Sequence, residues 1–79
     1  MLVKTKVRVL SVEERVSRKT GNMYRLLNFM DGSEISNTRI SPKVDEYVLA
    51  NLKPFDEYDV TFDFNLRYGS HSAVCIEEC

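Results

Sequence analysis

Hydrophobic and polar residues alternate along most of this chain, which is the pattern of β-strands that bury one face. In residues 2–16, Thr5, Val7 and Val9 alternate with basic side chains, and the alternation shifts within 11–14. A shift of this kind indicates that an extra residue is inserted in the strand. We therefore expect a long first strand that contains a β-bulge or a bend.

The same two-residue period recurs four more times along the chain. It predicts strands over residues 23–30, 34–40, 55–65 and 72–78. A polar segment with Gly21 predicts a turn over 17–22, Asp31–Gly32 is a strong signal for a tight hairpin, and residues 66–70 form a further hairpin tip.

One segment changes to the helical period. Ser41 is a typical N-cap and Pro42 a typical first helical residue, while Lys53–Pro54 is a stop signal, so we expect a helix of about 11 residues over 42–52. Its expected apolar stripe consists of Val44, Tyr47, Val48 and Leu52. The aromatic residues that we expect in the core are Tyr47, Phe55, Tyr58, Phe62 and Phe64.

The predicted order of elements is β-β-β-α-β-β. We expect a mainly β fold, a five-stranded OB-like Greek-key barrel with one short helix between strands 3 and 4, formed by residues 1–79 as a single domain. The helix would close one open end of the barrel. The alternative is a three-stranded meander packed with a helix and a hairpin as an open α+β roll.

Composition narrows the class of protein. The chain has 79 residues, 43% of them hydrophobic, and a formal net charge of −1. No apolar stretch approaches the length of a membrane span or resembles a signal peptide, so we expect a cytoplasmic protein without membrane association. The charge is unevenly distributed, since residues 1–39 carry +4 and residues 40–79 carry −5. This asymmetry builds a positive face, or it is neutralised internally by ion pairs between strands.

Catalytic and metal chemistry find little support. His71, Cys75 and Cys79 recur at every fourth residue, but four residues of strand span about 13 Å, too far for one metal ion. The same separation keeps Cys75 from the only imidazole, and the three glycines lie in three different turns. We expect a non-enzymatic protein with reduced cysteines, no cofactor and no small-molecule substrate.

Binding chemistry is better represented. Single-stranded nucleic acid is bound by cations along the phosphates and by aromatic faces on which unpaired bases stack. In an OB-like barrel the binding face is strands 2 and 3, flanked by the first and fourth hairpin loops. The basic, aromatic and polar residues at those places, which we predict to form the site, are Arg18, Lys19, Tyr24, Leu26, Asn28, Arg39, Arg67, Tyr68 and His71.

The segment Ser17–Leu26, with its Ser-Arg turn, glycine and Tyr-x-Leu strand, resembles the small OB-fold single-stranded DNA-binding proteins of phages and mobile elements, in particular the filamentous-phage helix-destabilising type. Arg18, Tyr24 and Leu26 match the DNA-contacting positions of that motif, and Tyr68 matches by its position in the fold. The resemblance implies binding of single-stranded DNA, with little sequence preference, by a homodimer or by cooperative coating.

Two other partners stay open. RNA offers the same unpaired bases and phosphates as single-stranded DNA. A small protein-interaction or inhibitor module from a mobile element, docking through an exposed strand or hairpin, would have the same size and a net charge near zero.

Overall fold

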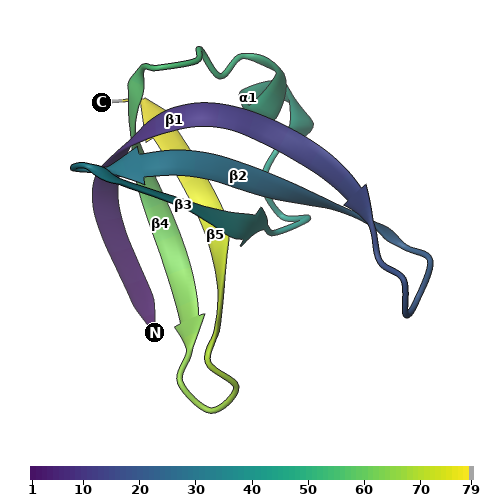
Figure 1. Cartoon of the computed structure of the whole chain (residues 1–79). Coiled ribbons are helices and arrows are strands. Elements are labelled where there is room, and N and C mark those ends of the chain that lie inside the picture. Colours follow the sequence, from purple (N-terminus) through teal and green to yellow (C-terminus); the bar gives the residue numbers. More distant parts are fainter. Residues whose placement is uncertain (79) are drawn as a thin grey trace.

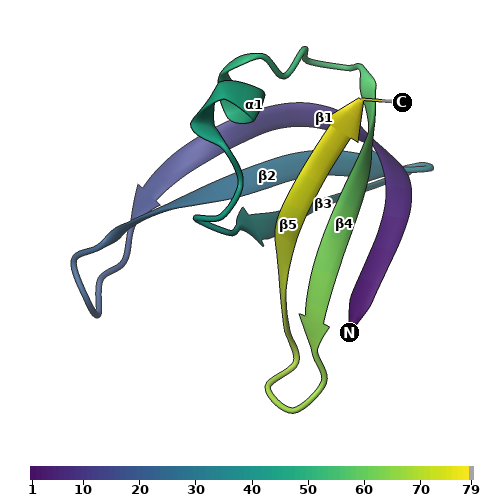
Figure 2. The same cartoon turned by 180° about the vertical axis from the view of Figure 1, so that it is seen from behind.

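The computed structural model describes residues 1–78, which form a closed five-stranded β-barrel (Figures 1 and 2). The elements are β1 (Leu2–Val16), β2 (Met23–Asp31), β3 (Glu34–Ile40), α1 (Glu46–Ala50), β4 (Glu57–Asn65) and β5 (Ser70–Glu78). The strand order around the barrel is β1-β2-β3-β5-β4. This architecture confirms the predicted OB-like barrel and excludes the open α+β roll.

Strand β1 belongs to both halves of the barrel. Its first part, Leu2 to Arg8, pairs antiparallel with β4, and its second part, up to Val16, pairs antiparallel with β2. The β1–β2 register shifts between Val9 and Ser11, which confirms the predicted irregularity and places it slightly earlier in the chain. After the shift Val12 packs against the core, so Ser11 and its alternate neighbours face outward.

Strands β3 and β5 close the barrel with a short parallel contact. Only Arg39–Ser72 and Ile40–Ala73 are in register among the described residues, and the Ser41 N–H extends the contact to the Ala73 carbonyl at 2.8 Å. The part of β3 nearest the β2–β3 hairpin therefore has a ladder partner on one side only.

The core fills the barrel interior. Leu27 and Val60 are completely buried, and the rings of Phe29 and Phe62 lie 5.4 Å apart at their centroids. Burial of each large side chain contributes about 1.5–3 kcal/mol, which a domain of this size needs. Of the predicted aromatic core, Tyr58 and Phe62 are buried, and Phe64 is partly buried against the cluster.

The helix is shorter than predicted and begins later. It starts after Asp45, whose carboxylate accepts a hydrogen bond from the Tyr47 N–H at 2.8 Å, and not at Pro42. Asp45 is the better-placed cap because the preceding turn, held by Ser41, directs Val44 into the core. Five residues are far fewer than a helix needs to cross a membrane, and the described chain has no other helix.

Two aromatic residues predicted in the core lie on the surface. Tyr47 is 75% exposed, because α1 packs Val48 and Leu49 against the barrel and Tyr47 therefore faces the solvent. Phe55 is 66% exposed, since its backbone is held to β1 by a hydrogen bond from its N–H to the Val9 carbonyl at 2.7 Å. The core predictions for Tyr47 and Phe55 were therefore wrong.

Candidate nucleic-acid interface

The outer face of β2 and β3 carries an aromatic ring covered by a cation. Leu26 is in register with Arg39, so Tyr24, two residues away on β2, is the diagonal neighbour of Arg39. The guanidinium carbon of Arg39 lies 4.3 Å from the centroid of the Tyr24 ring. A cation–π contact contributes about 0.5–1 kcal/mol, and this one holds the exposed Arg39 over the half-buried Tyr24 ring.

The two other β2 residues of the predicted site are occupied by the protein itself. Leu26 is only 9% exposed, which leaves almost no apolar surface for a base. The Asn28 amide donates to Ser11 Oγ at 3.0 Å and to Glu13 Oε1 at 2.9 Å. Asn28 therefore organises the outer face and offers little of its own hydrogen-bonding capacity to a ligand.

Glu13 puts a negative charge on the same face. Its carboxylate accepts from Asn28 and also from Arg15, at 3.0 and 3.2 Å. The hydrogen bond from Asn28, followed by the hydrogen bond and charge of Arg15, lowers the pKa of Glu13 below its ordinary value. The charge of Arg15 offsets that of Glu13, so this pair leaves the face close to neutral.

The β1–β2 turn projects two cations into solvent. The Ser17 N–H donates to the Asn22 carbonyl and the Gly21 N–H donates to the Ser17 carbonyl, both at 2.9 Å, and Gly21 has the positive φ that closes the turn. Arg18 and Lys19 lie in this hydrogen-bonded turn and are exposed. A turn with its own backbone bonds presents the two cations from a defined position.

The β4–β5 tip has a second pair of cation and ring. Asn65 Oδ1 accepts from the backbone N–H groups of Arg67 and Tyr68, at 3.1 and 3.3 Å, which orders the turn. Tyr68 is 74% exposed, and the Arg67 guanidinium carbon lies 5.6 Å from its ring centroid. An exposed tyrosine at an ordered tip is available to a partner.

His71 is exposed, and it lines a cavity in the barrel mouth. Its Nδ1 is 2.8 Å from the Oγ1 of the buried Thr38, and its ring packs against Phe64 with centroids 5.9 Å apart. Phe64 lines the same cavity. The structure therefore brings Tyr24 and Arg39 together on the outer face and places His71 on the inner side of β5.

The cations of the predicted site differ from most other basic residues in their ion pairing. Elsewhere, four of the seven basic residues are paired: Lys4 with Glu77, Arg8 with Glu57, Arg15 with Glu13, and Arg25 with both Glu14 and Glu46. Within residues 1–78, no carboxylate forms an ion pair with the four predicted site cations, which are Arg18, Lys19, Arg39 and Arg67. Lys6, Lys43 and Lys53 are also without such a pair.

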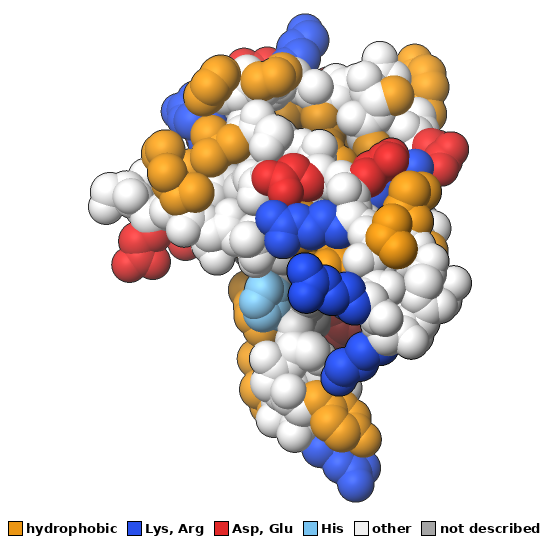
Figure 3. All heavy atoms as spheres, turned by 45° about the vertical axis from the view of Figure 1, so that its right-hand side comes forward, with side chains coloured by type: hydrophobic (Ala, Val, Ile, Leu, Met, Phe, Trp, Pro, Cys, Tyr) orange, Lys and Arg blue, Asp and Glu red, His pale blue; other side chains and the backbone are white. Residues whose placement is uncertain are grey.

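Figure 3 turns the β1–β2 hairpin toward the viewer and shows this surface. Basic side chains gather over its middle beside the histidine and recur at the lower tip, with acidic side chains mainly above them. The β1–β2 hairpin and the β4–β5 hairpin point in different directions (Figures 1 and 2), so their tips do not touch each other. Each tip lies at a border of this surface.

Sequence reasoning missed Glu13 and Arg15 as members of the outer face. The sequence did contain a signal for this arrangement. Val9 and Val12 are both apolar but three residues apart, so both can face the core only if the alternation of the strand shifts between them. It also missed the cavity at the barrel mouth, which depends on where the strands stop pairing.

Cys75 lies within β5 and forms no disulfide with any other described residue. Cys75 Sγ donates to Glu77 Oε1 at 3.4 Å, and burial followed by that carboxylate raises the pKa of the thiol. Cys79 lies outside the described residues. Within residues 1–78, no three His, Cys, Asp or Glu side chains are grouped as metal ligands.

The sequence was compared with models of known protein families and with curated proteins. No protein-family model matches the sequence, and no curated protein matches it. The functional argument therefore depends on the residues of the interface.

Proposed function

We propose that this protein binds single-stranded nucleic acid, DNA or RNA, without catalysis and with little sequence preference. The site is the outer face of β2 and β3 between the β1–β2 turn and the β4–β5 tip. The observation that carries the proposal combines two features. There are two cation–ring pairs, the exposed Arg39 on the half-buried Tyr24 and Arg67 beside the exposed Tyr68. Neither cation has a carboxylate partner among residues 1–78.

Each part of the site has a separate task in this proposal. Arg18 and Lys19 neutralise phosphates at one border of the surface, and Arg67 does so at the other. One base stacks on the guanidinium that covers Tyr24, and another stacks on the exposed ring of Tyr68, each contributing about 1–3 kcal/mol. The Asn28 amide is engaged by Ser11 and Glu13, so it is not available to read base edges, which supports weak discrimination between bases.

The test is binding of a fluorescein-labelled oligo(dT), followed by anisotropy at low salt. Tyr68→Leu should weaken binding by about 5- to 150-fold, which is the loss of one stacked base. Tyr47→Leu is the matched control, since Tyr47 is as exposed as Tyr68 but belongs to α1. No binding by the unaltered protein, or equal losses in the two variants, would refute the proposed site.

One observation favours docking on another protein as a second candidate. Val16 and Met23 face each other across the β1–β2 hairpin, and both are largely exposed. An apolar pair at a projecting hairpin is a feature of protein contacts. The same titration separates the two candidates, because a docking module without nucleic-acid affinity would leave the oligo(dT) anisotropy unchanged at every salt concentration.

A further inference from the structure

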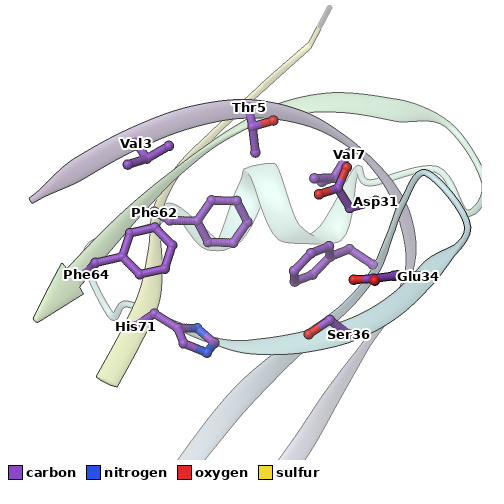
Figure 4. Close-up of a pocket in the computed structure, with 10 residues that line it drawn as sticks. Val3, Thr5, Val7, Asp31, Glu34, Ser36, Phe62, Phe64 and His71 are labelled. Atoms are coloured by element: carbon purple, nitrogen blue, oxygen red, sulfur yellow. The ribbon is translucent and has the colours of Figure 1, made fainter. Parts of the chain in front are cut away.

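A cavity of about 260 Å³ opens at the barrel mouth, between the β2–β3 hairpin and the adjoining ends of β1, β4 and β5 (Figure 4). It exists because β3 pairs with β5 only at Arg39 and Ile40, so the hairpin half of β3 does not close against β5. It lies on the inner side of the barrel and is separate from the nucleic-acid interface proposed above.

The walls of the cavity are aromatic and apolar. Phe62 and Phe64 point into it from β4, Phe29 adds a third ring from β2, and Val3 and Val7 line the side formed by β1. The Phe62 ring centroid is 5.4 Å from that of Phe29 and 6.1 Å from that of Phe64. Three rings in tilted contact form a surface that suits another flat apolar group.

One side of the cavity is acidic. Asp31 and Glu34 are directly opposite each other where β2 and β3 meet their hairpin, and both line the cavity. Like charges in register repel each other, and no cation among residues 1–78 pairs with either carboxylate. A ligand with a positive charge at this side would relieve the repulsion, whereas a phosphate would increase it.

The other side of the cavity offers a polar ring. Figure 4 shows His71 across the opening from Asp31 and Glu34. Its Nδ1 is engaged by Thr38, which fixes the imidazole and leaves its second ring nitrogen for a ligand hydroxyl.

We propose that this cavity binds a small phenolic amine, with its ring among the three phenylalanines, its ammonium group at Asp31 and Glu34, and its hydroxyl toward His71. The volume is slightly below the range of pockets for drug-sized ligands, which matches a molecule with one ring and a short aminoalkyl arm. Such a ligand lies outside the sequence-based expectation that the protein has no small-molecule partner.

The first experiment compares two probes of equal size and opposite polar character. Tyramine carries the ammonium group, and tyrosol replaces it with a neutral hydroxyl. In ¹H–¹⁵N NMR titrations, tyramine should shift the amides around Phe29, Phe64 and His71 with a dissociation constant on the order of 1 mM, and tyrosol should bind at least about tenfold more weakly. Equal affinity of the two probes, or shifts confined to other residues, would overturn the proposal.

The second experiment changes the acidic side. Asp31→Asn combined with Glu34→Gln should reduce tyramine affinity at least about fivefold, whereas Glu78→Gln, near the far end of β5, should not change it. Both variants alter exposed residues, and their unfolding curves verify that they are folded. Unchanged tyramine binding in the double variant would refute the assigned role of the carboxylates.

The cavity and the interface are tested independently. The double variant should retain its affinity for oligo(dT), and saturating tyramine should not displace the oligonucleotide. If the unaltered protein bound tyramine but not oligo(dT), the proposed function alone would be refuted. If the unaltered protein bound oligo(dT) but not tyramine, the cavity ligand alone would be refuted. Competition between the two ligands would contradict their separate placement on the inner and outer sides of the barrel.

Discussion

Phe55 is held in a backbone conformation that side chains rarely adopt. Its φ is +69°, and its backbone is fixed on both sides, by its N–H to Val9 and by its carbonyl, which accepts from Arg8 Nη1. A residue with a Cβ atom costs about 1–2 kcal/mol in the left-handed region. This conformational free energy is not offset by burial of the side chain, because most of the Phe55 ring is exposed to solvent.

Replacement of Phe55 measures that cost. Phe55→Gly should be more stable than Phe55→Ala by about 1 kcal/mol, because both variants lack the ring and only glycine relieves the strained φ. Urea unfolding monitored by circular dichroism gives the difference. Equal stabilities, or a more stable alanine variant, would show that the loop relaxes to negative φ when the ring is removed.

The interactions of Glu13 on the outer face make the stability of the protein depend on pH. Its pKa is lowered in the folded protein below the ordinary value of 4.5, so its favourable interactions are complete above about pH 4.5 and are lost as the pH falls through the folded pKa. We therefore expect the stability advantage of the parent protein over Glu13→Gln to shrink as the pH is lowered from 6 toward 3. Thermal unfolding across that range is the measurement, and Glu78→Gln, which removes an exposed carboxylate at the end of β5, is the control. A constant difference between the parent and Glu13→Gln would contradict the assignment.

At the scale of elements, strands were easier to predict than the helix. Alternation over nine or more residues specifies which side of a strand is buried, and β1 kept its predicted bounds of Leu2 and Val16. The segment before α1 contains two competing caps, Ser41 and Asp45, four residues apart. Local sequence does not reveal that Val44 must enter the core, which is what selects Asp45.

The cap of α1 gives a prediction for this element. Asp45→Ala should lower the free energy of unfolding by about 1 kcal/mol, because the hydrogen bond to the Tyr47 N–H is lost from a helix of only five residues. Asp45→Asn retains an acceptor and should lose much less. Chemical denaturation of both variants provides the comparison, and an unchanged stability in Asp45→Ala would indicate that α1 does not depend on this cap.

At the scale of the whole molecule, the barrel could be predicted, but the charge distribution on its surface could not. The order of elements and the long β1 were sufficient for the OB-like fold. Which cations remain unpaired depends on neighbours far apart in the sequence, such as Lys4 and Glu77. For the same reason the sequence could not show that His71 turns inward while Arg39 stays on the outer face.

The unpaired cations lead to a prediction about salt. The affinity for oligo(dT) should fall with a slope of log K against log salt of about −3 if the four site cations contact phosphates, and Arg18→Ala should reduce the magnitude of that slope by about 0.7. Lys53→Ala is the matched control, because Lys53 also has no ion pair within residues 1–78 but lies in the loop before β4. A slope near zero in the parent protein, or an equal change in the control, would contradict phosphate contacts at the β1–β2 turn.

The brief contact between β3 and β5 has a consequence for assembly. Separation of Arg39 from Ser72 and of Ile40 from Ala73 uncouples the β4–β5 arm from β3 while both hairpins keep their own ladders. Each opened molecule then presents two complementary strand edges, and an identical edge is available on every other copy. If two copies opened in this way, the β3 edge of one would pair with the β5 edge of the other, which is the geometry of a domain-swapped dimer.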